Sequence, residues 1–287
     1  MKAFINLFKV RIGVAIAFAA AAGLAVEQGT EVGFLKALVL ITAVLVAASA
    51  AGAFNQYVER DLDVRMARTR NRPFVTGALR HGPFWLWVIG AMLLASVVAT
   101  SIATNVLAAI YVFLGAFTYG VVYTVWLKRR TWWNIVVGGL AGSFAVLAGA
   151  AARISADSPA PGPESLALAV VLFLWTPPHF WSLAIAYRDD YAAAGVPMLP
   201  VVVGNDRAAR AIFASAALLV AASLVPFFFS MGIIYLASAV AGGAFLLLRC
   251  KALVQRPGRE TARAAFLASL VQLCAVLFGA MADVAIL

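Results

Sequence analysis

A short polar segment interrupts a chain that is otherwise almost entirely apolar. The segment NQYVERDLDVRMARTRNRP, residues 55–73, carries three acids and five arginines between two long apolar runs. At about 100° per residue on a helix, Asn55, Glu59 and Asp63 fall on one face, whereas Asp61 points elsewhere. Three converging oxygen-bearing side chains suit a hard divalent cation, and Mg²⁺ binds a few carboxylates together with phosphate oxygens and water.

These acids also have a plainer interpretation, in which a solvated helix end pairs its carboxylates with Arg60 and Arg65. That interpretation would explain any single acid equally well. The spacing i, i+4 and i+8 favours the metal site instead, with Asn55, Glu59 and Asp63 as its ligands.

A second polar cluster, TPPHFWSLAIAYRDDYAAAGVPMLP at residues 176–200, lies in and after another apolar run. Pro177 and Pro178 remove helix hydrogen bonds and are expected to kink the chain, and broken backbone in a membrane mainly lines cavities. An unbroken helix would place His179 and Asp190, eleven residues apart, within about 20° of each other. A lone histidine is usually a hydrogen-bonded core residue, but an ionisable group inside a span predicts a functional role.

Several cations accompany the acids. They are Arg72 in TRNRP and the run Lys128, Arg129 and Arg130 in YTVWLKRRTWWN. Arginine suits bidentate recognition of phosphate, although each cation could also be an ordinary anchor at the membrane surface. Acids on one face, cations beside them and an apolar interior predict a site that holds a diphosphate through Mg²⁺ at the membrane surface, with a long apolar tail inside the bundle.

The elements that must position these residues are apolar helices. The chain has 287 residues, of which 64% are hydrophobic and 12% are charged, against about 25% charged in a soluble domain. Runs of 18 or more nearly uncharged residues recur, each long enough to cross a bilayer core of about 30 Å, and they are too long and too uniform for barrel strands. The sequence therefore predicts an all-α polytopic membrane protein in one domain, residues 1–287.

Nine apolar segments can be marked. They lie at about 12–28, 33–56, 84–103, 106–126, 134–152, 166–186, 210–229, 231–248 and 264–285. The first begins like a signal peptide, with Lys2, Lys9 and Arg11 before an alanine-rich stretch, but it is interpreted as a spanning helix. No Arg- and Ser-rich transit peptide precedes it, which favours a bacterial inner membrane.

The positive charges predict the orientation. The N-terminal tail and the loops near 57–83, 127–133, 187–209 and 249–263, together with the adjoining Arg210, hold 20 of the 22 Lys and Arg residues. Cytoplasmic loops carry this excess, so the N-terminus is predicted inside and the C-terminus outside. The same bias explains the formal charge of +10 without a nucleic-acid partner. Cys250 and Cys274 form no metal or disulfide pattern.

Three stretches together resemble the UbiA superfamily of membrane prenyltransferases, and in particular its branch that farnesylates haem. They are NQYVERDLDVRMARTRNRP, YTVWLKRRTWWNIVVGG and TPPHFWSLAIAYRDDYAAAGVPMLPVV. The resemblance spans the whole chain. Two departures stand out: Glu59 replaces the aspartate common in the Asn-x-x-x-Asp-x-x-x-Asp motif, and Ala145 and Val146 replace a proline pair.

The resemblance implies a reaction in which farnesyl diphosphate, haem B (protohaem IX) and water give haem O and diphosphate. It also implies nine helices around a central cavity, a Mg²⁺ requirement, and as partners the two substrates, the bilayer and possible contact with a downstream haem-modifying enzyme. By position, the implied catalytic residues are Asn55, Glu59, Asp63, His179, Asp189 and Asp190; the metal ligands are Asn55, Glu59, Asp63 and Asp190; and the diphosphate-binding cations are Arg72, Lys128 and Arg129.

Two other kinds of membrane protein would share some of these residues. A prenyltransferase for an aromatic or quinone-precursor acceptor would share the acids, but such relatives carry an aspartate where this chain has His179. An ion-coupled transporter would also carry acids and broken helices, but it would need them near the bilayer midplane. The acids of this chain are instead predicted to gather at one membrane surface.

Overall fold

The computed structural model describes residues 2–155 and 159–286, and within these ranges every regular element is a helix. Eight helical stretches are long and apolar enough to cross a membrane, and a ninth, α2, is shorter at 17 residues. The nine passes are α2 (Val10–Val26), α3 (Phe34–Val58), α6 (Phe84–Ala103), α7 with η1 (Val106–Phe117, Thr118–Leu127), α8 with α9 (Asn134–Gly138, Leu140–Ala151), α10 (Pro163–Ala186), α13 with η2 (Asn205–Ser223, Val225–Phe229), α14 (Ile233–Gln255) and α15 (Arg259–Ile286). Eight of the nine predicted segments coincide with helical stretches long enough to span a membrane, and the first coincides with the shorter α2. Most predicted ends agree to within about five residues, but α14 continues to Gln255, beyond the predicted end at 248.

The passes pack in the order of the chain. Each pass contacts the next one along the sequence, and α15 returns to α2, so the helices close into a ring. Further contacts between α2 and α9, and between α10 and α15, cross the inside of this ring. The all-helical membrane fold is as predicted.

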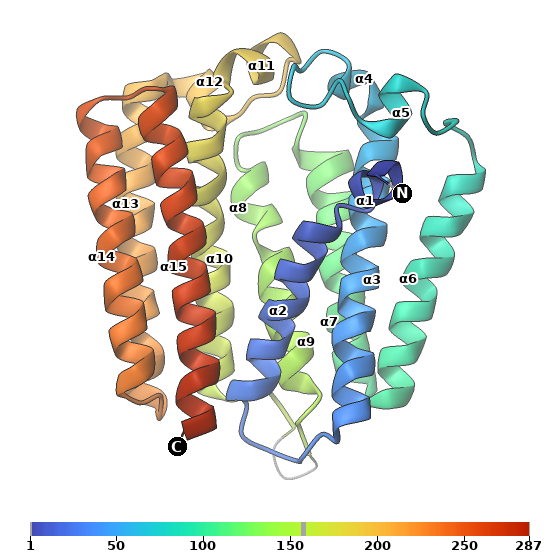
Figure 1. Cartoon of the computed structure of the whole chain (residues 1–287), viewed down its shortest axis with the longest axis vertical. Coiled ribbons are helices and arrows are strands. Elements are labelled where there is room, and N and C mark those ends of the chain that lie inside the picture. The colour runs from blue at the N-terminus through green and yellow to red at the C-terminus, as the bar shows by residue number, and fades with distance from the viewer. Residues whose placement is uncertain (1, 156–158, 287) are drawn as a thin grey trace.

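One end of the bundle carries the short helices (Figure 1). These are α1 (Lys2–Leu7), α4 (Arg60–Asp63), α5 (Pro73–Thr76), α11 (Arg188–Ala193) and α12 (Leu199–Val203). We call this the loop end; the C-terminus lies at the opposite end. The loop end therefore brings together the two polar clusters singled out in the sequence.

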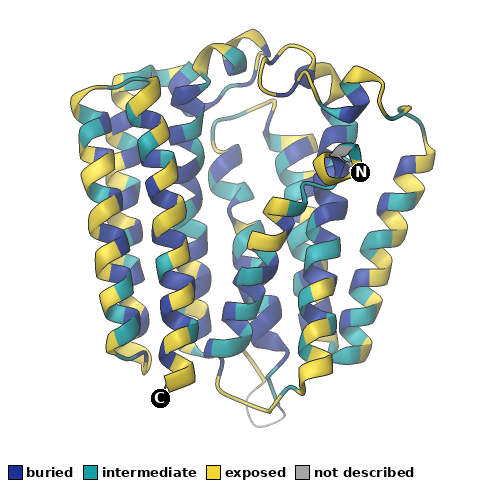
Figure 2. Cartoon of the chain, viewed as in Figure 1, coloured by how far each residue is buried: buried dark blue, intermediate teal, exposed yellow. Residues whose placement is uncertain are grey.

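The outward faces of the peripheral helices are exposed (Figure 2), and many of their exposed residues are large and apolar. On α6, for example, Trp87 and Ile102 are each 80% exposed. A soluble protein rarely leaves such a surface open to water, and here it fits contact with lipid chains. The interior is lined largely by alanine and glycine instead.

Two glycines allow α2 and α9 to pack closely. A methyl group on Gly23 would lie 2.1 Å from the Val146 carbonyl oxygen, and one on Gly149 would lie 1.9 Å from that of Ala20. Small residues of this kind let membrane helices approach backbone to backbone. Val146, which departs from the proline pair of relatives, thus lies in a continuous α9 and packs against α2.

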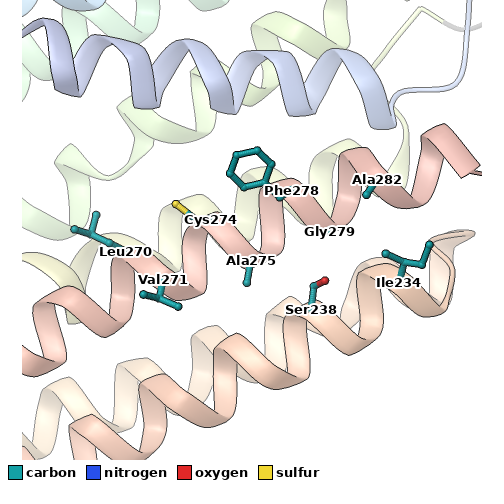
Figure 3. A pocket seen from close by; sticks show the side chains of 9 residues that line it. All are labelled: Ile234, Ser238, Leu270, Val271, Cys274, Ala275, Phe278, Gly279 and Ala282. Carbon is teal, nitrogen blue, oxygen red and sulfur yellow. The ribbon is translucent and has the colours of Figure 1, made fainter.

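The hollow shown in Figure 3 is an apolar groove between α14 and α15. Several of its lining residues, among them Leu270, Val271 and Phe278, are exposed, so it opens on the outer surface. A second apolar groove lies between α3 and α6. Neither is the central cavity implied by the resemblance, which stays a prediction.

The helix does not end at the two prolines, and the kink expected there stays a prediction. Helix α10 continues from Pro163 to Ala186 through Pro177 and Pro178. It ends at Ala186, because the next residue, Tyr187, has a φ of −127° that departs from helical geometry. Helix α11 begins at Arg188. The two polar residues aligned on an unbroken helix, His179 and Asp190, therefore lie on different helices.

Candidate active site

The first motif lies where α3 ends and α4 begins. The Glu59 amide donates to the Asn55 carbonyl (3.0 Å) and the Asp63 amide to the Glu59 carbonyl (2.9 Å), so helical spacing continues across the junction. Asn55, Glu59 and Asp63 are 2% exposed or less, whereas the Asp61 side chain is 54% exposed. The predicted common face of the three residues is confirmed.

Each of these three side chains faces a cation. Lys9 Nζ donates to Asn55 Oδ1 (2.6 Å), and Lys128 Nζ donates to both Glu59 carboxylate oxygens (2.6 Å each). Arg72 Nη1 reaches the Asp63 oxygens at 2.8 and 2.6 Å, and lies 3.9 Å from Glu59 Oε2. We call these six residues, Asn55, Glu59, Asp63, Lys9, Arg72 and Lys128, the acid–cation cluster. The structure thus brings together the first motif and two of the predicted diphosphate-binding cations.

Burial dominates the electrostatics of this cluster. Burial raises the pKa of Asp63 above its ordinary value, although the Arg72 guanidinium opposes the shift. Burial, followed by repulsion from Arg72, holds the pKa of Lys9 well below its ordinary value. Ionised groups held out of water in this way favour opposite charge, and they interact more strongly than exposed groups do.

Lys9 was missed as a site residue because the sequence shows it only as one positive charge of the N-terminal tail. It lies between α1 and α2 with φ of +46°, a left-handed conformation that is uncommon outside glycine. This turn lets Lys9 Nζ reach both Asn55 and the hydroxyl of Tyr119, 3.0 Å away. Backbone strain of this kind often accompanies functional sites.

The η1 segment, Thr118–Leu127, is a π-helix rather than the expected continuation of an α-helix. Its i to i+5 spacing appears where the Lys128 amide donates to the Tyr123 carbonyl (2.9 Å). The Thr124 hydroxyl donates to the Tyr119 carbonyl and accepts from the Asn55 amide. The π-helix therefore aims Tyr119, Thr124 and Lys128 at the cluster, as π-helical turns often do at functional sites.

Arg129 does not join the acid–cation cluster. Its guanidinium forms two hydrogen bonds of 2.8 Å with the Asp61 carboxylate on the outside of the α3–α4 junction. Arg129 is 40% exposed, and its hydrogen bond lowers the pKa of Asp61. Its predicted role in holding diphosphate remains a prediction that would require this surface pair to open.

The two aspartates of the second motif lie on α11. Asp190 is half-buried and accepts a hydrogen bond of 3.2 Å from the Arg68 backbone amide, which ties α11 to the loop carrying Arg72. Asp189 is exposed. The structure brings Asp190 to the neighbourhood of the first motif, but not into hydrogen-bond contact with Asp63.

His179 lies on α10, inside the bundle, and its side chain contacts α15. Its ring stacks between those of Trp175 (centroids 4.0 Å apart) and Phe266 (4.4 Å), and its Nδ1 lies 2.8 Å from the Ser269 hydroxyl. At 6% exposure it is a buried, hydrogen-bonded histidine. The bond to Ser269 fixes the ring orientation and leaves Nε2 as the nitrogen available to a ligand.

The donor atoms of the first motif fit Mg²⁺ in chemical type, since they are buried carboxylate and amide oxygens. Within residues 2–155 and 159–286, however, no three His, Cys, Asp or Glu side chains gather closely enough to hold a metal by themselves. A metal would therefore need oxygen ligands from a bound diphosphate, as Mg²⁺ sites commonly do. Arg72 and Lys128 lie against the same carboxylates, and their predicted contact with a diphosphate stays a prediction.

Comparison with known proteins identifies the class. The model of the UbiA prenyltransferase family matches residues 15–271, so the chain belongs to the UbiA prenyltransferase family. A structure of digeranylgeranylglyceryl phosphate synthase superposes with a TM-score of 0.79 at 17% identity, covering 100% of this chain and 99% of the other. A UbiA homologue from Archaeoglobus fulgidus bound to DMAPP and Mg²⁺ gives a TM-score of 0.71 at 16% identity over 98% and 99% of the two chains.

Proteins more similar in sequence belong to a narrower group within this family. Protoheme IX farnesyltransferase 2 of Paramagnetospirillum magneticum is 54% identical over 283 residues, which cover 99% of this chain and 97% of that protein. Protoheme IX farnesyltransferase 1 of the same organism is 44% identical over 98% of this chain and 97% of its own. Both similarities extend through both polar motifs.

Proposed function

We propose that this enzyme transfers a farnesyl group from farnesyl diphosphate to a vinyl group of haem B, with addition of water, to give haem O and diphosphate. The observation that carries the proposal is the acid–cation cluster, which offers buried oxygens for a metal and cations for a diphosphate at one end of an apolar bundle. The names of the two near full-length relatives support haem as the acceptor.

In this proposal Asn55, Glu59, Asp63 and Asp190 would hold Mg²⁺. The bound ion would supply positive charge to the diphosphate as the leaving group departs. The structure of a family member with DMAPP and Mg²⁺ supports a divalent metal. We assign Asp189, which is exposed beside Asp190, a supporting role at the mouth of the same site.

Lys128 and Arg72 would stabilise the negative charge that develops on the diphosphate as the farnesyl C1–O bond breaks. A new carbon–carbon bond then joins C1 to the terminal vinyl carbon of haem. Water adds its hydroxyl to the other vinyl carbon and releases one proton. Because early capture of the farnesyl cation by water would waste the substrate, the apolar interior must keep bulk water from C1.

We propose that His179 contacts the haem. This histidine lies among aromatic side chains of α10 and α15, and its Nε2 could approach the iron, since Nδ1 is held by Ser269. His179→Ala is expected to weaken haem B binding by about tenfold or more while farnesyl diphosphate binding survives. Haem binding is measured from the Soret band and diphosphate binding by isothermal titration.

Ser269→Ala is the matched control, because it keeps the imidazole and removes only the hydroxyl at Nδ1. It should weaken haem binding less than His179→Ala does. Unchanged haem O production by the His179→Ala protein would leave this residue with a packing role alone.

We propose a bacterial inner membrane location with the loop end in the cytoplasm, because that end carries most of the Lys and Arg residues. A reporter inserted near Gly77 should be cytoplasmic, and one fused after Leu287 should lie outside. If both report from the same side, the number of passes is wrong by an odd number. The product would remain in this membrane for a downstream haem-modifying enzyme.

The function itself is tested with the purified protein in detergent or lipid discs. Incubation with haem B, farnesyl diphosphate and Mg²⁺ should yield haem O, detected by chromatography and mass, together with one diphosphate per haem O. Omission of Mg²⁺ should abolish product. Transfer to an aromatic acid in preference to haem would refute the assignment of the acceptor.

A further inference from the structure

Three arginine side chains surround the ring of Tyr187, the residue that directly follows α10. The guanidinium carbons of Arg68, Arg259 and Arg263 lie 5.6, 5.7 and 5.7 Å from its centroid. Arg68 comes from the loop after α4, and the other two come from the first turns of α15. We call these four residues the arginine–tyrosine cluster. Because its members are distant in sequence, the fold itself gathers these charges.

The guanidinium groups of this cluster have no carboxylate in ion-pair contact within the part of the chain that the structure describes, although the Asp190 carboxylate accepts from the Arg68 backbone amide. Their polar contacts reach phenols instead: Arg263 Nη2 donates to the Tyr187 hydroxyl (3.3 Å), and Arg68 Nη2 to that of Tyr191 (3.4 Å). Three positive charges therefore face the same ring, and none of the three guanidinium groups is in ion-pair contact with a described carboxylate.

The start of α15 adds to the positive potential. A helix N-terminus carries a partial positive charge, so cations are unfavourable there, yet Arg259 and Arg263 occupy the first two turns. Glu260 lies in the same turn but pairs with neither of them within the described ranges. The Arg263 hydrogen bond, together with the nearby arginines, lowers the pKa of Tyr187. Cations at a helix N-terminus are locally unfavourable, and such an arrangement is expected where a bound anionic ligand offsets the repulsion.

The cluster lies beside the aromatic surface that surrounds His179, on the same two helices. Ser269, which bonds His179, is six residues from Arg263, or about 9 Å along α15. Phe266 lies between them and stacks on His179. A buried group of aromatic side chains is thus followed along α15 by arginines at the loop end, an order that suits an apolar ligand with carboxylates on one edge.

We propose that the arginine–tyrosine cluster binds the two propionate carboxylates of the haem acceptor. This inference rests on the proposed function. Haem carries both propionates on one edge and its vinyl groups on the other half of the ring, so anchored propionates turn the vinyl edge away from the arginines and into the bundle. The two anionic substrates then use separate cations, with Arg72 and Lys128 reserved for the diphosphate.

The test compares haem B with its dimethyl ester, which keeps the ring, iron and vinyl groups but has no propionate charge. Both are titrated into the full-length protein in discs of zwitterionic lipid, and affinity is read from the Soret band. The wild-type protein should bind the ester roughly 100-fold more weakly than haem B, since one guanidinium–carboxylate contact at a partly exposed site contributes about tenfold.

The variants are Arg259→Gln, Arg263→Gln and the double replacement, with Arg207→Gln on α13 as an exposed control at the loop end. Each single variant should weaken haem B binding about tenfold and leave ester binding and the KM for farnesyl diphosphate unchanged. The control should bind both ligands like the wild type. Equal loss of haem B and ester binding, or no loss of either, would overturn the proposal.

An anionic lipid headgroup shares the chemistry of a propionate, so lipid is the second arm of the test. If the arginines served lipid alone, the double variant would lose co-purifying phosphatidylglycerol while the wild type would bind haem B and ester equally well. That result would overturn the propionate assignment and leave the enzyme assignment intact. Failure of the wild type to bind either form of haem would instead refute haem as the acceptor, and the propionate site with it.

Discussion

Asp63→Asn should lower turnover by about 10²–10³, the usual effect of removing one charge partner from a transition state. The substitution barely changes volume, and asparagine can still accept one hydrogen bond from Arg72, whose Nη1 now contacts both carboxylate oxygens. The loss should therefore appear in kcat, with partial recovery at higher Mg²⁺, while the protein remains folded and monodisperse in detergent. Initial rates of haem O formation across a Mg²⁺ titration measure this effect.

Asp61→Asn is the matched control, because Asp61 lies two residues away on the exposed side and, among the residues that the structure describes, forms its ion pair with Arg129. Exposed ion pairs contribute about 0–1 kcal/mol, so its activity should stay within a few fold of the wild type. Comparable losses at Asp61 and Asp63 would contradict the helical-face argument. Near-normal rates for both Asp63→Asn and Asp190→Asn would contradict the metal–diphosphate mechanism itself.

Lys128→Met should combine a loss of turnover of about 10²–10³ with a marked loss of stability. Lys128 is 8% exposed, and it donates to both oxygens of Glu59, which is 1% exposed. Removing one partner of a buried ion pair costs about 3–5 kcal/mol, because the other charge remains buried and unpaired. The melting temperature in detergent should therefore fall together with the activity.

The double variant Glu59→Gln/Lys128→Met separates the two effects. It removes both charges at once, and replacing a whole buried pair is often nearly neutral for stability. Its melting temperature should recover toward the wild-type value while its turnover stays low. A double variant that recovered activity as well would assign this pair to folding alone.

Local patterns were sufficient to predict the membrane passes and the common face of the first motif. Apolar length alone identifies helices such as α6 and α14, since a span needs about 20 residues. The positions of Asn55, Glu59 and Asp63 follow from helical periodicity, which persists across the α3–α4 junction. These features depend on neighbours in the chain, so a single sequence is enough.

Features that depend on contacts between distant segments were not predictable. Lys9 and Asn55 are 46 residues apart, and Lys128 and Glu59 are 69 apart, so nothing local pairs them. The end of the α10 pass at residue 186 was predicted, but the change of direction at Tyr187 between α10 and α11 was missed, for a different reason. Tyr187 carries no glycine or proline signal, yet its conformation turns the chain and separates Asp190 from His179.

The number of residues in the π-helix η1 determines where its side chains lie in the site. Its spacing places Thr124 opposite Tyr119 and brings Lys128 into bonding distance of Tyr123. Deletion of one residue from Thr118–Leu127 would favour ordinary α-helical bonding and remove the i to i+5 hydrogen bonds that now position Thr124 and Lys128. The exposed side chains of this segment, Val121, Val125 and Trp126, could change with little consequence, whereas its number of residues could not.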